Sequence, residues 1–138
     1  MRITPLTVAK ILLIDDEEIV RETLTDFLTS AGHSVEQATD GKKALKLLEN
    51  TAYDLIIMDV FMPEVDGIEL IQILAKRSGQ PPIITISGGG GILPPNWSIK
   101  LTEVFGVTYA LTKPIDMNLF LSTVKEALLP LERNSGQG

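Results

Sequence analysis

Short, unbroken runs of apolar residues recur along this chain and constrain its fold more than any other feature. The clearest are KILLID at residues 10–15, DLIIM at 54–58 and IITIS at 83–87. A strand exposed on one face alternates apolar and polar residues, whereas a continuous apolar run is typical of a strand buried on both faces. Strands of that kind occur in parallel sheets with helices on both sides, so the sequence predicts an α/β protein.

Segments with helical periodicity separate these runs, and Gly32 lies where a helix C-terminal glycine is expected. The pattern predicts five βα units in a doubly wound parallel five-stranded sheet, for which the flavodoxin-like strand order 2-1-3-4-5 is the commonest. The expected strands are 10–15, 33–38, 54–58, 83–87 and 107–112, and the expected helices are 17–31, one capped by Asp40, 66–76, 97–104 and 117–129.

Composition removes several classes of function. The chain has 138 residues and no cysteine, which excludes thiol catalysis, disulfides and zinc–thiolate sites. Its apolar runs are far shorter than the roughly 20 residues that span a bilayer, and its N-terminus lacks a signal-like apolar core, so we expect a cytoplasmic protein away from the membrane. The net charge of −6, without a basic stripe, argues against direct nucleic-acid binding.

Chemically active side chains follow four of the five expected strands: Asp15 and Asp16, Asp59, Ser87, and Lys113. The carboxyl ends of parallel strands meet at one edge of the sheet, so these side chains should converge there. Clustered carboxylates repel one another, and Mg²⁺ is the natural counter-ion for oxygen ligands of this kind. A metal, a lysine and a hydroxyl together suit a phosphoryl group, which a carboxylate can accept as an aspartyl phosphate.

Four motifs at these strand ends carry a resemblance to a known family. They are LLIDDEE at 12–18, DLIIMDVFMPEVDG at 54–67, IITISG at 83–88 and YALTKP at 109–114. Together, and in this order, they resemble the receiver domain of two-component response regulators. The resemblance covers about residues 10 to 130, nearly the whole chain.

The resemblance implies a role for each residue. Asp59 accepts the phosphoryl group, Lys113 pairs with that carboxylate and then with the phosphoryl oxygens, Ser87 is the switch hydroxyl, and the Gly88 amide donates to the phosphoryl group. Mg²⁺ is held by Asp16, Asp59 and the backbone carbonyl of Phe61, with Asp15 acting through water. Pro114 resembles a proline after a cis peptide bond, and Met62, Pro63 and Gly67 shape the loop beneath Asp59.

The same resemblance implies partners and boundaries. The phosphodonor would be a histidine kinase or a histidine phosphotransfer protein, and the output would be a changed face for a downstream protein target. The chain would be either a stand-alone receiver or a receiver cut from a larger protein, and we expect a monomer or a weak dimer. We expect an N-terminal extension at 1–9, the receiver domain at 10–131 and a flexible tail at 132–138.

Other interpretations of these residues remain open. Asp15 or Asp16 could cap the helix that follows, Ser87 could be an ordinary strand-end hydroxyl, and Lys113 could be a solvated loop lysine. The chain could be a receiver-like interaction module that never turns over phosphate. A phosphatase of the haloacid dehalogenase type also uses a strand-end aspartate, but it would want a second acid where Phe61 stands.

Two positions depart from the family pattern. The family usually has an aromatic residue three positions before the lysine, whereas this chain has Ala110 there and Tyr109 one position earlier. Since strand side chains alternate between faces, Tyr109 should not substitute without a slip or a bulge. Phe61 is large for a position near the attacking water, so we expect it to affect the lifetime of the phosphoryl group.

The glycine run at 88–91 lacks a P-loop lysine, and we interpret it as a movable loop rather than a nucleotide site.

Overall fold

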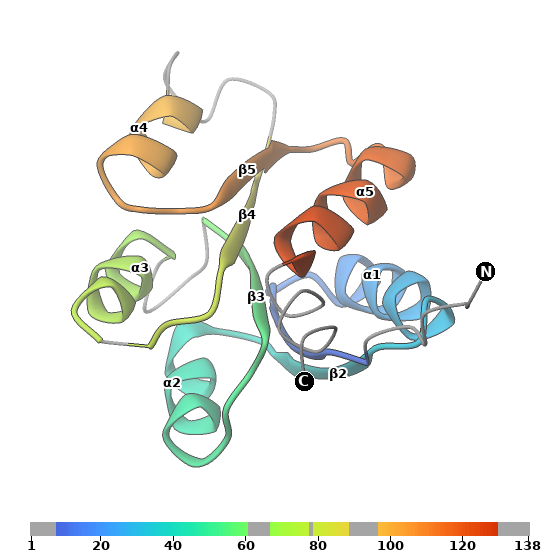
Figure 1. Ribbon diagram of the computed structural model, residues 1–138, viewed down its shortest axis with the longest axis horizontal. Coiled ribbons are helices and arrows are strands. Elements are labelled where there is room, and N and C mark those ends of the chain that lie inside the picture. Colours follow the sequence, from blue (N-terminus) through green and yellow to red (C-terminus); the bar gives the residue numbers. More distant parts are fainter. Residues whose placement is uncertain (1–7, 61–66, 78, 89–96, 130–138) are drawn as a thin grey trace.

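The computed structural model describes residues 8–60, 67–77, 79–88 and 97–129, and within them strands and helices alternate along the chain (Figure 1). The elements are β1 (Lys10–Ile14), α1 (Glu18–Ser30), β2 (Ser34–Ala38), α2 (Gly41–Asn50), β3 (Leu55–Asp59), α3 (Gly67–Ala75), β4 (Ile83–Ser87), α4 (Trp97–Glu103), β5 (Tyr109–Thr112) and α5 (Met117–Ala127).

The strands form one parallel sheet in the order β2-β1-β3-β4-β5, which confirms the predicted fold class. The three central strands are almost entirely buried, as their continuous apolar runs predicted, while β2 and β5 lie at the edges and are more exposed. Because every strand runs the same way, the carboxyl ends of β1, β3, β4 and β5 share one edge of the sheet.

Alternate side chains of each strand enter two separate hydrophobic cores. Leu12 and Ile14 of β1 pack in the core beneath α2, α3 and α4, whereas Ile11 and Leu13 pack in the core beneath α1 and α5. Figure 1 shows these two helical layers, α1 and α5 on one face of the sheet and the other three helices on the opposite face. Burial on both faces leaves the strand ends as the place where polar groups can gather.

Local signals set several element ends as predicted. Asp40 caps α2 by accepting the Lys43 N–H at 2.9 Å, and this hydrogen bond holds the pKa of Asp40 below its ordinary value. Gly32 has φ of 98°, the left-handed conformation that follows a helix. The strand expected from 107 begins only at Tyr109, because the Val107 N–H donates to the Leu101 carbonyl at the end of α4.

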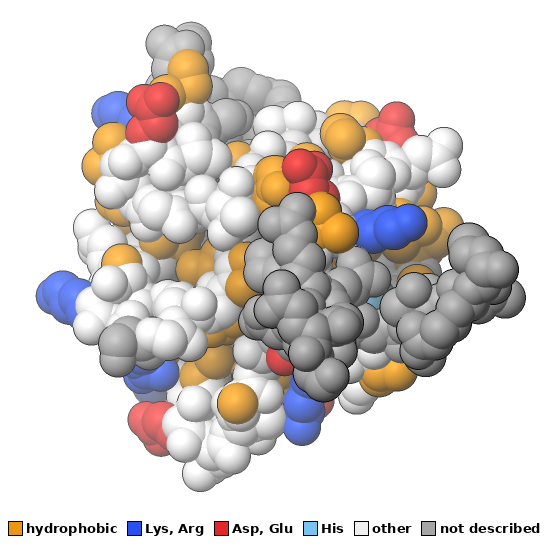
Figure 2. All heavy atoms as spheres, viewed as in Figure 1, with side chains coloured by type: hydrophobic (Ala, Val, Ile, Leu, Met, Phe, Trp, Pro, Cys, Tyr) orange, Lys and Arg blue, Asp and Glu red, His pale blue; other side chains and the backbone are white. Residues whose placement is uncertain are grey.

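On the face seen in Figure 2, the coloured Lys and Arg side chains lie apart from one another and form no basic stripe. In the described parts of the chain, no helix combines the length and the apolar character needed to cross a bilayer.

Candidate functional site

The carboxyl edge of the sheet brings together most of the residues that the sequence singled out. Asp15 and Asp16 follow β1, Asp59 is the last residue of β3, Ser87 the last residue of β4, and Lys113 comes directly after β5. The sheet register fixes how far each residue lies along the strand direction. Asp59 of β3 lies beside Ile86 of β4, and Ser87 of β4 lies beside Thr112 of β5.

Four acidic residues form a cluster at this edge: Asp15, Asp16, Glu17 and Asp59, each with a carboxylate oxygen within 4.8 Å of one from every other. Asp15 and Asp59 are buried, with 1% and 4% of their surface exposed, while Asp16 and Glu17 face solvent. Oxygen ligands at this spacing are the kind that Mg²⁺ prefers in proteins. The acidic cluster could therefore hold a hard divalent cation.

Lys113 places one ammonium among these carboxylates. Its Nζ lies 2.9 Å from Glu17 Oε1 and 3.5 Å from both Asp15 Oδ2 and Asp59 Oδ2. Partial burial alone lowers the pKa of Lys113, but the hydrogen bond to Glu17 and the charges of Asp59 and Asp15 outweigh it, so the net pKa is raised. Lys113 is therefore a charged ion-pair partner, not a solvated loop lysine.

Asp15 is the cluster member with a buried carboxylate oxygen that has no hydrogen bond in the described structure. Its Oδ1 accepts the Glu17 N–H at 2.8 Å, whereas Oδ2 has no hydrogen-bond partner among the residues that the structure describes. The ammonium of Lys113, 3.5 Å from Oδ2, is near enough for charge attraction but forms no hydrogen bond with it. Burial raises the pKa of Asp15, against the Glu17 hydrogen bond and the Lys113 charge. A buried carboxylate oxygen left in this condition fits a site for a cation.

The turn between β1 and α1 is fixed from both sides. The Asp15 side chain holds the Glu17 N–H, and the Arg21 guanidinium donates to the Asp15 carbonyl at 2.8 Å. Helix α1 has Glu17 at its cap position, without a side-chain capping bond, so the alternative in which Asp16 caps the helix is wrong. Asp15 instead supports the turn while facing the cluster.

Ser87 and Gly88 lie at the end of β4. Ser87 is buried, and its hydroxyl donates to the Leu111 carbonyl over a long 3.4 Å. The Ser87 carbonyl accepts the Lys113 N–H at 2.8 Å, which ties the two strand ends together. The Lys113–Pro114 peptide bond is cis, as the family resemblance implied. Phe61, Met62 and Pro63 lie outside the described residues.

Tyr109 and Ala110 point to opposite faces of β5, so no slip or bulge compensates for the missing aromatic residue. Ala110 packs in the core beneath α2, α3 and α4, while Tyr109 packs in the core beneath α5. Burial raises the pKa of Tyr109, and the charge and hydrogen bonding of Glu126 on α5 raise it further. An aromatic switch on the α4 side is therefore not available through Tyr109.

Sequence analysis missed Glu17, which has the shortest contact with Lys113. The motif LLIDDEE contains it, but the helical pattern of residues 17–31 places it at the start of the following helix. The available signal was its place two residues after Asp15 at the end of a strand, where a turn can direct a side chain back over the sheet edge.

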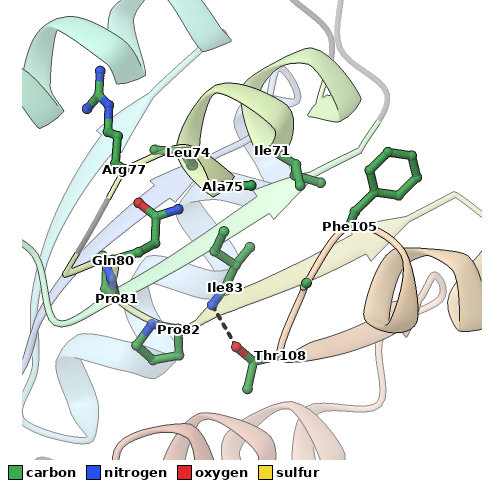
Figure 3. A pocket seen from close by; sticks show the side chains of 11 residues that line it. Ile71, Leu74, Ala75, Arg77, Gln80, Pro81, Pro82, Ile83, Phe105 and Thr108 are labelled. Atoms are coloured by element: carbon green, nitrogen blue, oxygen red, sulfur yellow. Dashed lines mark hydrogen bonds between the residues drawn. The ribbon is translucent and has the colours of Figure 1, made fainter.

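Two surface hollows differ in character from the acidic cluster. One of about 320 Å³ lies at the opposite edge, between the C-terminal end of α3 and the start of β4 (Figure 3). It is lined by Arg77, Gln80, Pro82 and Phe105 among others, and none of the described residues that line it carries a carboxylate. A second hollow, of about 340 Å³, adjoins Lys113 between α1 and the β5–α5 connection and is mostly apolar.

Comparison with known proteins gives consistent matches. A family model described as the response regulator receiver domain matches residues 11–125. The Regulator of RpoS from Escherichia coli is 33% identical over 132 residues, which cover 95% of this chain but 38% of that relative. This chain thus spans well under half the length of that relative.

Solved structures agree with this. The chemotaxis response regulator CheY4 of Vibrio cholerae superposes with a TM-score of 0.77 at 31% identity, covering 88% of this chain and 100% of that one. The Francisella response regulator 1452 receiver domain gives a TM-score of 0.80 at 28% identity, covering 89% and 98%.

Proposed function

Because the chain belongs to the response regulator receiver domain family, we propose that it accepts a phosphoryl group on Asp59 in a Mg²⁺-dependent reaction and signals by changing the face that it offers to a partner. The observation that carries the proposal is the position of Asp59. It ends a fully buried strand, 4% exposed, among other carboxylates and 3.5 Å from a lysine ammonium. Receiver domains are signalling phosphoacceptors and not conventional enzymes.

In the proposed reaction an Asp59 carboxylate oxygen attacks the donor phosphorus. A new oxygen–phosphorus bond forms, and the bond from phosphorus to the donor's histidine nitrogen breaks, with its electron pair leaving on that nitrogen. Lys113 lies within reach of the Asp59 oxygen and would contact the added phosphoryl oxygens. Hydrolysis of the aspartyl phosphate by water would return Asp59 to its carboxylate form.

Asp15, Asp16 and Asp59 would hold the Mg²⁺, with the backbone carbonyl of Phe61 as a further ligand. The carboxylate spacing and the unpartnered Asp15 oxygen support this assignment. The bound ion would neutralise the negative charge that gathers on the phosphoryl oxygens.

Ser87 would act as the switch hydroxyl and the Gly88 amide as a phosphoryl donor. The Ser87 hydrogen bond to Leu111 is 3.4 Å long, which is weak enough to exchange for a phosphoryl oxygen. With Ala110 in place of an aromatic residue, the readout would depend on the loop after Gly88 and on α4.

Receiver domains pair with histidine kinases or phosphotransfer proteins, and we propose a phosphodonor of this class. The apolar hollow beside Lys113, with Ile19 on α1 exposed to 78%, suits a donor that must approach Asp59 from this side. We further propose a cytoplasmic protein, monomeric or weakly dimeric, that acts on a protein target and not on nucleic acid directly.

Mass spectrometry of the intact protein after incubation with a small acyl-phosphate donor tests this proposal. We expect one phosphoryl group to be added with Mg²⁺ present and none with a chelator or in the Asp59→Asn variant. The matched control is Asp54→Asn, which changes the aspartate at the other end of the same strand and should leave labelling intact.

A receiver-like interaction module that never turns over phosphate is the alternative. It would take up neither the phosphoryl group nor beryllofluoride, an acyl-phosphate mimic, in the presence of Mg²⁺. Labelling that persists in Asp59→Asn would contradict Asp59 as the acceptor, and turnover of a generic phosphate ester would favour a phosphatase.

A further inference from the structure

The nearest carboxylate to the Lys113 ammonium belongs to Glu17, not to the proposed acceptor. The Nζ–Oε1 distance to Glu17 is 2.9 Å, a hydrogen-bonded ion pair, whereas both buried aspartates lie 3.5 Å away. Lys113 thus makes its closest contact with an exposed member of the acidic cluster that is neither the proposed phosphoryl acceptor nor a proposed Mg²⁺ ligand.

The backbone around Glu17 explains why its side chain faces the lysine. Asp15 Oδ1 holds the Glu17 N–H at 2.8 Å, and Arg21 holds the Asp15 carbonyl, so the turn before α1 has little freedom. The Glu17 side chain is 59% exposed and that of Lys113 is 19% exposed. Glu17 is therefore held in place by its backbone, while its carboxylate remains free to release the ammonium into solvent.

We propose that Glu17 is a positioning residue that holds Lys113 in the unphosphorylated protein and releases it when Asp59 is phosphorylated. This inference rests on the proposed phosphoacceptor function. Phosphorylation replaces the single charge of Asp59 by a phosphoryl group of higher charge, which strengthens the pull on the ammonium from that side. The pair with Glu17 is weak because it is partly solvated, so the lysine can exchange partners.

Glu17 thereby competes with the phosphoryl group for the same ammonium. Removing its charge takes away the competitor in the free protein and has no effect once Lys113 has moved. Exposed ion pairs of this kind stabilise by less than about 1 kcal/mol, so we expect Glu17→Gln to bind beryllofluoride about two- to fivefold more tightly.

The experiment measures beryllofluoride affinity by calorimetry at saturating Mg²⁺ for the wild type, Glu17→Gln and Glu18→Gln. Glu18 is the matched control because it is the next residue, is exposed, loses the same charge, and is absent from the acidic cluster. Saturating Mg²⁺ separates the effect from any change in metal affinity. In the metal-free protein, the Lys113 Cε methylene NMR resonance reports the contact itself.

Tighter binding in Glu17→Gln but not in Glu18→Gln, with the Lys113 resonance moved only by Glu17→Gln, is the expected result. Equal affinities for the two variants, or weaker binding in Glu17→Gln, would overturn the role of Glu17. A wild type that binds no beryllofluoride and takes no label on Asp59 would instead overturn the phosphoacceptor proposal, and the resonance would still decide whether the pair exists.

Discussion

An aspartate lies at each end of β3, and the surroundings of the two differ. Asp54, before the strand, accepts the Lys10 N–H at 2.8 Å and donates its own N–H to the Lys10 carbonyl at 2.7 Å. Asp59, at the end of the strand, lies among three other acidic residues and shares one ammonium with two of them. The same residue type thus makes backbone hydrogen bonds just before β3 and faces the acidic cluster at its end.

Neighbouring groups extend this contrast. Near Asp54, the Tyr53 hydroxyl donates to Glu36 at 2.8 Å, and Lys10 pairs with Glu36 at 3.5 Å. Near Asp59, Asp15 retains a buried oxygen without a hydrogen bond in the described structure. At the amino edge, where the strands begin, these polar groups pair with one another, whereas at the carboxyl edge a buried carboxylate oxygen has no hydrogen bond in the described structure.

The two edges of the sheet should differ most in how much stability is lost when a glycine at each edge is replaced by alanine. In Gly67→Ala the new Cβ would meet the backbone of Val60 and lie 2.7 Å from the Asp59 carbonyl oxygen, so the end of β3 must move. We expect Gly67→Ala to lower the free energy of unfolding by about 3 kcal/mol, measured by urea denaturation.

Gly79, in the loop before β4, provides the control. It has φ of 71°, and a Cβ added there would have no neighbouring atom within 4 Å among the described residues. Gly79→Ala should therefore lower the free energy of unfolding by only about 1 kcal/mol, the cost of the left-handed conformation. Phosphoryl uptake should fall in Gly67→Ala at a temperature where it remains folded and should be unchanged in Gly79→Ala. Equal stability of the two variants would mean that the carboxyl edge can relax.

Replacing one aspartate at each edge should separate metal binding from stability. Asp15→Asn removes a buried charge without a hydrogen bond on Oδ2, so we expect about tenfold weaker Mg²⁺ binding by calorimetry and a metal-free protein that is more stable than the wild type. Asp54→Ala leaves the Lys10 N–H without its partner, so we expect a loss of about 1–2 kcal/mol with unchanged Mg²⁺ affinity.

The proposed difference between the two edges is wrong if Asp15→Asn and Asp54→Ala change Mg²⁺ affinity and stability in the same way. A loss of stability in metal-free Asp15→Asn would indicate that Asp15 acts mainly through its hydrogen bond to Glu17. Weaker Mg²⁺ binding in Asp54→Ala would indicate that the amino edge is coupled to the site through β3.

Asp15 should also give stability a pH dependence in the metal-free protein. Its pKa is raised above the ordinary value of 3.8, chiefly by burial, so the folded protein binds this proton more tightly than the unfolded chain. This contribution to stability is complete below about pH 3.8 and is lost as the pH rises through the raised pKa. Urea midpoints in chelator should therefore fall over this range in the wild type relative to Asp15→Asn.

Saturating Mg²⁺ provides the check on that assignment. The ion favours the ionised carboxylate, so it should stabilise the wild type increasingly as the pH rises through the same range. If the wild type and Asp15→Asn had parallel pH profiles in chelator, the pKa of Asp15 would be ordinary in the folded state.

Sequence reasoning predicted which residues gather at the candidate site because their positions depend only on strand direction. Asp59 and Lys113 lie where any parallel sheet with these apolar runs would put them, whatever their side-chain conformations. The burial of both sheet faces followed in the same way, whereas the strand order was predicted as the commonest one for five strands and the cis Lys113–Pro114 bond from the family resemblance. The fold is thus set by patterns that extend over whole strands.

Contacts that depend on the conformation of a single turn could not be predicted from the sequence. The Glu17–Lys113 pair joins residues 96 positions apart and exists because Asp15 fixes the turn before α1. The late start of β5 depends on how α4 ends, through the bond from Val107 to Leu101. Both features depend on hydrogen bonds formed at a single turn, which residue patterns do not encode.

Tyr53→Phe should give the smallest effect and the sharpest test of the amino edge. The Tyr53 hydroxyl donates to Glu36, so its removal should lower the free energy of unfolding at neutral pH by about 1 kcal/mol and leave phosphoryl uptake unchanged. Burial, with Glu36 as hydrogen-bond partner and nearby charge, raises the pKa of Tyr53 to about 12.

Because that pKa is raised, the Tyr53 proton stabilises the fold fully below pH 10 and progressively less as the pH rises toward 12. The stability difference between wild type and Tyr53→Phe, followed by urea denaturation, should therefore shrink over this range. A constant difference would mean that the hydroxyl is solvated, in which case the amino edge would owe its stability to the Asp54–Lys10 bonds and not to the Tyr53–Glu36 pair. Any change in phosphoryl uptake would show instead that the two ends of β3 are not independent.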